Sequence, residues 1–98
     1  MIQKRNVRNS DQVKISFVLP GDHPKAEASV VGDFNGWDSK ANPLKKRSNG
    51  TYSTTVTIEK GKRYHFRYQA ADGDWFDAGD ADAYEPNQFG SENGVVLT

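Results

Sequence analysis

Residues 30–37 of this 98-residue chain read Val-Val-Gly-Asp-Phe-Asn-Gly-Trp. The two β-branched residues favour a strand, and the Asn35-Gly36 pair readily adopts positive φ angles, so we expect the strand to end in a turn. Trp37 follows this turn at once. A strand-end turn places such a large ring at the edge of a sheet, where it either packs under the fold or faces a ligand.

The sequence on both sides of this stretch alternates between apolar and polar residues, and a period of two is typical of half-buried strands. Pro, Gly and Asn-Gly signals separate the alternating segments, and none has a helical period over ten residues. Within 63–71, Tyr64, Phe66 and Tyr68 share one face and Arg67 lies on the other. The expected strands are 13–19, 26–32, 52–58, 63–71, a short return strand at Trp75, and 95–97. Residues 39–48 are expected to form a loop with Leu44 as its anchor, and His65 is expected to be an exposed residue of the strand 63–71.

Six or seven short strands with turns every eight to twelve residues predict an all-β fold, an antiparallel β-sandwich. We expect residues 13–98 to form it as a single domain, which is large enough to close one core without a metal or disulfides. Residues 1–12 are polar and basic without a period. This segment is expected to be an N-terminal arm, partly ordered at best, or a poor edge strand.

Composition limits the function classes. The chain has no cysteine, which excludes thiolate chemistry and fits a reducing compartment, so we expect a cytoplasmic protein. The formal net charge is zero, which argues against nucleic-acid binding through bulk electrostatics. The first dozen residues lack the apolar core of a secretory signal, and no run approaches the roughly 20 apolar residues of a membrane span. We expect neither a nucleic-acid nor a membrane partner.

No motif in the sequence indicates an active site. His23 and His65 stand without a catalytic motif around them, and a small glycoside hydrolase would need two carboxylates in a cleft for which the chain has little room. The acidic run at 77–82 does not have the spacing of a calcium-binding EF-hand loop. The basic residues at 45–47 are a weak signal for phosphate. We therefore expect no catalytic residue, no metal site and no cofactor.

The aromatic residues give a clearer signal. Trp37 and Trp75 both occur at strand-edge turns among polar residues. An indole face stacks on the apolar face of a pyranose ring, while nearby donors and acceptors bind its hydroxyl groups. Arg67 and Asn93 would complete such a sugar site. The alternative at this point is structural, in which both tryptophans cap the ends of the sandwich.

A resemblance favours the sugar site. Several motifs, taken together and in this order, resemble the glycogen-binding carbohydrate-binding module family, which includes the β subunit of the AMP-activated protein kinase and the N-terminal isoamylase-type domains of branching and debranching enzymes. The likeness extends over nearly all of 13–97. The motifs are Gly32-Asp33-Phe34-Asn35-Gly36-Trp37, Pro43-Leu44, Tyr64-His65-Phe66-Arg67-Tyr68, Asp72-Gly73-Asp74-Trp75 and the tail from Asp82 to Val96.

The resemblance implies an immunoglobulin-like β-sandwich and a set of sugar-binding positions. Trp37 and Trp75 match the two stacking tryptophans. Arg67 lies where the kinase subunit has a lysine that contacts sugar hydroxyls, and a guanidinium donates hydrogen bonds with a different reach.

Three tail residues match further positions. Phe89 lies where the kinase subunit uses an aliphatic residue to hold the sugar, and Ser91 and Asn93 match a hydroxyl and an amide that bind glucose. We therefore expect a non-catalytic module that binds α-1,4-linked glucan, as in glycogen or maltooligosaccharides. The alternative is a protein-interaction module that docks on a glucan-metabolising enzyme or a kinase-like partner and binds no sugar itself.

Overall fold

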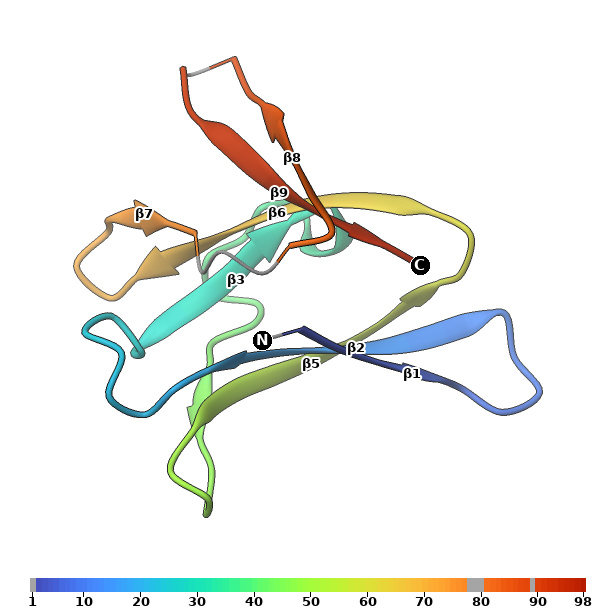
Figure 1. The fold of residues 1–98 in the computed structure, drawn as a ribbon, viewed down its shortest axis with the longest axis horizontal. Coiled ribbons are helices and arrows are strands. Elements are labelled where there is room, and N and C mark those ends of the chain that lie inside the picture. The colour runs from blue at the N-terminus through green and yellow to red at the C-terminus, as the bar shows by residue number, and fades with distance from the viewer. Residues whose placement is uncertain (1, 78–80, 89) are drawn as a thin grey trace.

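A computed structural model describes residues 2–77, 81–88 and 90–98 and shows two antiparallel sheets that face each other (Figure 1). The first sheet has the order β1-β2-β5-β4, and the second has the order β3-β6-β9-β8 with β7 paired to β6. The predicted all-β sandwich is confirmed. The strands are β1 (Ile2–Asn6), β2 (Gln12–Leu19), β3 (Ala28–Gly32), β4 (Lys45–Lys46), β5 (Tyr52–Glu59), β6 (Arg63–Ala70), β7 (Trp75–Phe76), β8 (Ala83–Pro86) and β9 (Glu92–Leu97), and the 3-10 turn η1 (Asp33–Asn35) follows β3.

The described residues contain more strands than the six or seven predicted. The additional ones are β4, which is two residues long and was expected to be loop, and β8, which forms an edge of the second sheet. Each is short and carries no run of alternating apolar residues, so its pairing is set by the neighbouring strand. None of the described residues belongs to a helix long and apolar enough to cross a membrane.

The core lies between the two sheets and follows the predicted alternation. Every second residue of β2 is buried, from Val13 to Leu19. Phe17 is fully buried, and its ring centroid lies 5.0 Å from that of Phe66 on the opposite sheet and 5.7 Å from that of Phe34 in η1. The turn that carries Trp37 is thereby anchored on the core through Phe34.

The N-terminal residues 2–6 form the edge strand β1, which pairs with β2 in register from Ile2 opposite Phe17 to Asn6 opposite Val13. Lys4 reaches across to the second sheet, and its Nζ lies 2.6 Å from Asp82 Oδ2. The same carboxylate accepts a hydrogen bond from the backbone of β9, so one acidic group joins the edges of both sheets.

The second sheet is interrupted along one side of β6. At one end of β6, residues 63–66 pair with β9; at the other end, residues 68 and 69 pair with β7. Arg67 lies between these two pairings. On the other side of β6 the pairing with β3 continues past this point, and Arg67 pairs with Val31. The outer face of the second sheet is therefore split beside Arg67.

Candidate functional site

A hollow of about 770 Å³ lies at the split in the second sheet. Its lining residues come from the loop after η1, from β6 and β7, and from the β8–β9 hairpin. In Figure 1, β7 and the β8–β9 hairpin extend in different directions from β6. It brings together five residues predicted from the sequence, and Phe89, the sixth, lies outside the described residues. Its lining is Trp37, Arg67, Trp75, Asn87, Gln88, Ser91 and Asn93.

The turn after β3 places Trp37 in the hollow with an unusual backbone conformation. Gly36 and Trp37 have φ angles of 66° and 60°, whereas Asn35 belongs to the 3-10 turn. A positive φ suits glycine, but for a bulky residue it costs on the order of 1–3 kcal/mol. The Trp37 amide donates to the Gly32 carbonyl over 3.0 Å, which holds this conformation. Strain of this kind is concentrated at functional positions.

The Asn35 side chain closes the same turn from inside. Its Oδ1 accepts a hydrogen bond from the Gly32 amide over 3.1 Å. Its Nδ2 donates to the Val30 carbonyl over 2.9 Å and to Asn42 Oδ1 over 2.8 Å. One amide side chain therefore satisfies backbone groups of β3 and ties the turn to the following loop.

Asp33 connects the Trp37 ring to β6. The indole Nε1 donates to Asp33 Oδ1 over 3.1 Å. The other carboxylate oxygen accepts from the His65 backbone amide over 2.8 Å and lies 3.0 Å from the His65 Nδ1. The edge of the indole is thus held by a carboxylate that is itself held by the neighbouring strand, while the ring remains 38% exposed.

His65 was expected to be an exposed strand residue, but it is half-buried between two carboxylates. Its Nε2 lies 2.6 Å from Glu85 Oε1, and Glu85 also forms an ion pair with Arg63. Partial burial opposes the charged ring, but the hydrogen bonds to Glu85 and Asp33 outweigh it and raise the pKa of His65. The Arg63 and His65 side chains lower the pKa of Glu85.

Trp75 and Arg67 form the second half of the site. Phe76 packs inward on Tyr68 with a centroid separation of 5.3 Å, so its neighbour Trp75 points outward and is 45% exposed. The Arg67 Cζ lies 5.9 Å from the centroid of the Trp75 ring, within the range of a cation–π contact. This contact orients the guanidinium beside the indole.

Arg67 has unused hydrogen-bonding capacity. Its side chain is only 16% exposed, and Nε lies 3.7 Å from Asp77 Oδ1, beyond hydrogen-bonding distance. Among the described residues, Nε has no hydrogen-bond partner. A hydroxyl oxygen of a ligand could accept from this guanidinium.

The turn between β8 and β9 supplies amide and hydroxyl groups. The Asn87 Nδ2 donates to Asn93 Oδ1 over 3.1 Å, and Asn87 Oδ1 accepts from the Ser91 backbone amide over 3.2 Å. The Asn87 and Ser91 backbones are also bonded across the turn. The Asn93 oxygen thus fixes the turn, while its NH₂ group donates to no partner among the described residues.

Taken together, the hollow offers two flat apolar rings, one cation, and several amide and hydroxyl groups. Such a set suits a neutral ligand that has apolar faces and many hydroxyl groups. No group of three or more His, Cys, Asp or Glu side chains within the described residues is arranged to hold a metal ion.

Comparison with known proteins decides the family. The family model of carbohydrate-binding module 48, the isoamylase N-terminal domain, matches residues 23–84. This chain belongs to the carbohydrate-binding module 48 family. The match includes Trp37, Arg67 and Trp75, whereas Ser91 and Asn93 lie beyond it.

Curated relatives of this module are much longer enzymes. The chain is 34% identical over 70 residues to 1,4-alpha-glucan branching enzyme GlgB 2 of Xanthomonas campestris pv. campestris, which is 70% of this chain and 10% of that protein. It is 44% identical over 63 residues to 1,4-alpha-glucan branching enzyme GlgB of Burkholderia pseudomallei, which is 62% of this chain and 8% of that protein. The chain thus spans about a tenth of the length of these relatives.

Some residues of the module's site were not predicted. Asn87 and Gln88 line the hollow because the β8–β9 turn folds toward Trp75, and the Pro-Asn-Gln sequence at 86–88 signals only a turn. The Asp33–His65 contact was also missed because it joins the turn η1 to the strand β6, which are distant in the sequence. By contrast, His23 lies outside the hollow and has a packing role, since its ring stacks on Phe76 with a centroid separation of 5.3 Å.

Proposed function

We propose that this module binds α-1,4-linked glucan chains in the hollow of the second sheet, without catalysing a reaction. Trp37 and Trp75 stack on glucose rings, and Arg67, Ser91 and Asn93 bind hydroxyl groups. Phe89 is included in the proposal as the residue that clamps the chain. The curated relatives support this substrate class, since they are 1,4-alpha-glucan branching enzymes.

The observation that carries the proposal is the convergence of two half-exposed indole rings on one hollow with an underused guanidinium. A structural role for both tryptophans would favour burial of the rings, since burial of apolar area is what stabilises a fold. Here Asp33 holds the edge of the Trp37 ring, Arg67 contacts Trp75, and both tryptophans remain partly exposed.

The proposed contacts imply weak binding at one site. Covering two indole faces contributes roughly 2–3 kcal/mol of net affinity after the cost of ordering the ligand. With the polar contacts, this corresponds to a Kd from the micromolar to the millimolar range. A branched polymer presents many chain ends, so avidity would strengthen its binding.

Tryptophan fluorescence tests the proposal. Wild-type protein, Trp37→Ala and Trp75→Ala are titrated with maltoheptaose, and with a β-1,4-linked glucose oligomer as the linkage control. We expect a saturable change with maltoheptaose in the wild type, and its loss in both variants while circular dichroism shows them folded. Each variant keeps one indole as a reporter. A folded wild type that does not respond up to millimolar maltoheptaose contradicts the proposal.

A second candidate function is docking on a glucan-metabolising enzyme. It is favoured by the small share, about a tenth, that the matching segment makes up in the branching-enzyme relatives. This function predicts that a partner protein covers Trp37 and Trp75 and that the free module does not bind sugar. The same titration separates the two candidates.

A further inference from the structure

A second hollow, of about 450 Å³, opens on the same sheet beside the first one. It carries no indole ring among its described lining residues. Its surface is made instead by backbone and by small or polar side chains. Those used below are Glu27, Ser29, Ser39, Gln69 and Gly73.

The two hollows are consecutive along β6. Arg67 lines the first hollow and Gln69 the second, and their side chains share the outer face of β6, about 6–7 Å apart. The return strand β7 runs antiparallel to β6, with Trp75 opposite Gln69. The direction from Trp75 to Gly73 is therefore the same in space as the direction from Arg67 to Gln69.

The loop after η1 repeats this step, and β3 borders the second hollow. In the loop after η1, Trp37 lines the first hollow and Ser39 the second. On β3, Val31 pairs with Arg67, and Ser29, which lines the second hollow, pairs with Gln69. Both β6 and the loop after η1 thus pass from one hollow to the next within two residues, whereas β3 lines only the second hollow. The two hollows therefore lie next to each other on the outer face of the second sheet.

We propose that the second hollow is an additional subsite, which holds further glucose units of a chain whose other units lie on the tryptophans. This inference rests on the proposed function and extends it, because it makes the module selective for longer chains. The occupant follows from continuity, since a linear chain that continues from Trp75 across β6 passes over Gln69, which pairs with Trp75, and then over Ser29, which pairs with Gln69 on β3.

The groups in the second hollow suit sugar hydroxyls. The Gln69 Nε2 donates to the Gly73 carbonyl over a long 3.3 Å, and its Oε1 has no partner among the described residues. The hydroxyls of Ser29 and Ser39 likewise form no side-chain hydrogen bond within the described part of the chain. Glu27 adds an exposed carboxylate, which accepts from hydroxyl groups. Without an aromatic platform, this subsite adds affinity only through hydrogen bonds.

Calorimetric titration of the wild type, Gln69→Ala and Gln12→Ala with maltotriose and maltoheptaose tests the inference. Maltotriose is short enough to remain on the tryptophans. Gln12 is the matched control, because it is an exposed glutamine on β2 of the other sheet. We expect the wild type to bind maltoheptaose more tightly. We expect Gln69→Ala to weaken maltoheptaose binding about two- to tenfold and to leave maltotriose binding unchanged. Gln12→Ala should change neither.

Four results would overturn the inference. Equal wild-type affinity for both sugars, or an unchanged maltoheptaose affinity in Gln69→Ala, would remove the second subsite and leave the proposed function standing. Equal weakening of both sugars in Gln69→Ala would show that Gln69 acts only by positioning Trp75. A wild type that binds neither sugar would overturn the proposed function, and the inference with it.

Discussion

The outer faces of the two sheets differ in the continuity of their strand pairing. In the first sheet, β2 and β5 pair without a break over eight residues, from Gln12 opposite Glu59 to Leu19 opposite Tyr52. In the second sheet, β6 changes neighbour from β9 to β7 beside Arg67. The hollow that contains both tryptophans lies at this change of neighbour.

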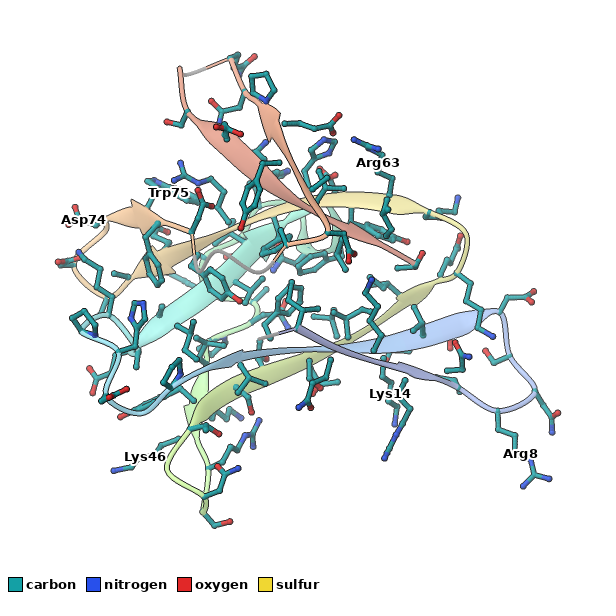
Figure 2. All side chains as sticks on the ribbon, in the orientation of Figure 1. Arg8, Lys14, Lys46, Arg63, Asp74 and Trp75 are labelled. Carbon is teal, nitrogen blue, oxygen red and sulfur yellow. The ribbon has the colours of Figure 1, made fainter. Side chains whose placement is uncertain are left out.

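The side chains on the two faces differ accordingly. The unbroken face carries hydroxyls and lysines, such as the Ser16–Thr55 hydroxyl pair at 2.8 Å and Lys14 opposite Thr57. Figure 2 shows Lys14 pointing away from the sandwich, on the side opposite to Trp75. An unbroken ladder gives each side chain two flanking neighbours and leaves a closed surface, whereas the break leaves room for a ligand among outward-pointing groups.

The largest expected difference between the faces concerns their cations. Arg67→Ala removes a nearly buried guanidinium whose hydrogen bonds to a ligand would be charge-assisted, each worth about 1.5–3 kcal/mol. We expect maltoheptaose affinity to fall by about 10- to 100-fold. Lys14→Ala, on the unbroken face, should leave it unchanged. Calorimetry on both variants makes the comparison, and equal losses would contradict the assignment of the site.

Gly32→Ala compares the two sheets through the free energy of unfolding. A Cβ at Gly32 would lie 2.5 Å from the His65 carbonyl oxygen and 3.0 Å from the Phe66 Cβ, so the split sheet cannot accept it without a shift. We expect the free energy of unfolding to fall by about 1–3 kcal/mol. Thr57→Ala, at an exposed position of β5, should stay within about 0.5 kcal/mol. Urea unfolding measures both variants. An unchanged midpoint for Gly32→Ala would contradict the prediction, because it would mean that the backbone shifts at no cost to admit the methyl group.

Asn93→Asp is expected to have a smaller effect on maltoheptaose affinity than Arg67→Ala. This change keeps the oxygen that accepts from Asn87 and removes the NH₂ group that we assign to the sugar. Loss of one hydrogen bond, worth about 0.5–1.5 kcal/mol, should weaken maltoheptaose binding about two- to tenfold. The melting temperature should change little. A full loss of folding would instead mark Asn93 as structural.

The smallest expected effect is a dependence of stability on pH through His65. This residue has no counterpart on the unbroken face. Its pKa is raised above the ordinary value of 6.5, so its contribution to stability is complete below pH 6.5 and is lost as the pH rises through the raised pKa. The lowered pKa of Glu85 has the opposite sign, since its contribution is complete above 4.5 and is lost on acidification.

Stability should therefore be greatest between about pH 4.5 and 6.5 and should decline above it, as shown by urea unfolding from pH 5 to 8. A neutral ring donates through one nitrogen only, so it cannot satisfy Asp33 and Glu85 together. His65→Gln should remove the decline. If that variant follows the wild-type profile, His65 is not the group responsible.

The sequence was sufficient to predict the strands in which apolar and polar residues alternate. Val13–Leu19, Tyr52–Ile58 and Tyr64–Ala70 bury every second residue almost as expected, and Leu44 is buried as the predicted loop anchor. The strand β8 was missed because it is an edge strand with no fully buried residue and a terminal proline.

The candidate site was predictable only in part. Trp37 and Trp75 were found from their turns, because an aromatic ring beside an Asn-Gly or Asp-Gly signal is a local feature. The break beside Arg67 was not predictable, since it depends on where β9 stops and β7 begins along β6. The Asp33–His65 hydrogen bond, which spans 32 residues, likewise depends on the register of β3 against β6.

Nuclear magnetic resonance of the ¹⁵N-labelled wild type, titrated with maltoheptaose, tests the central claim most directly. If the broken sheet holds the sugar, shifts will be concentrated at the indole N–H groups of Trp37 and Trp75 and at the backbone amides of Arg67 and Asn93. The amides of β2 and β5 will stay in place. Shifts along β2 and β5, or none at millimolar sugar, would contradict it.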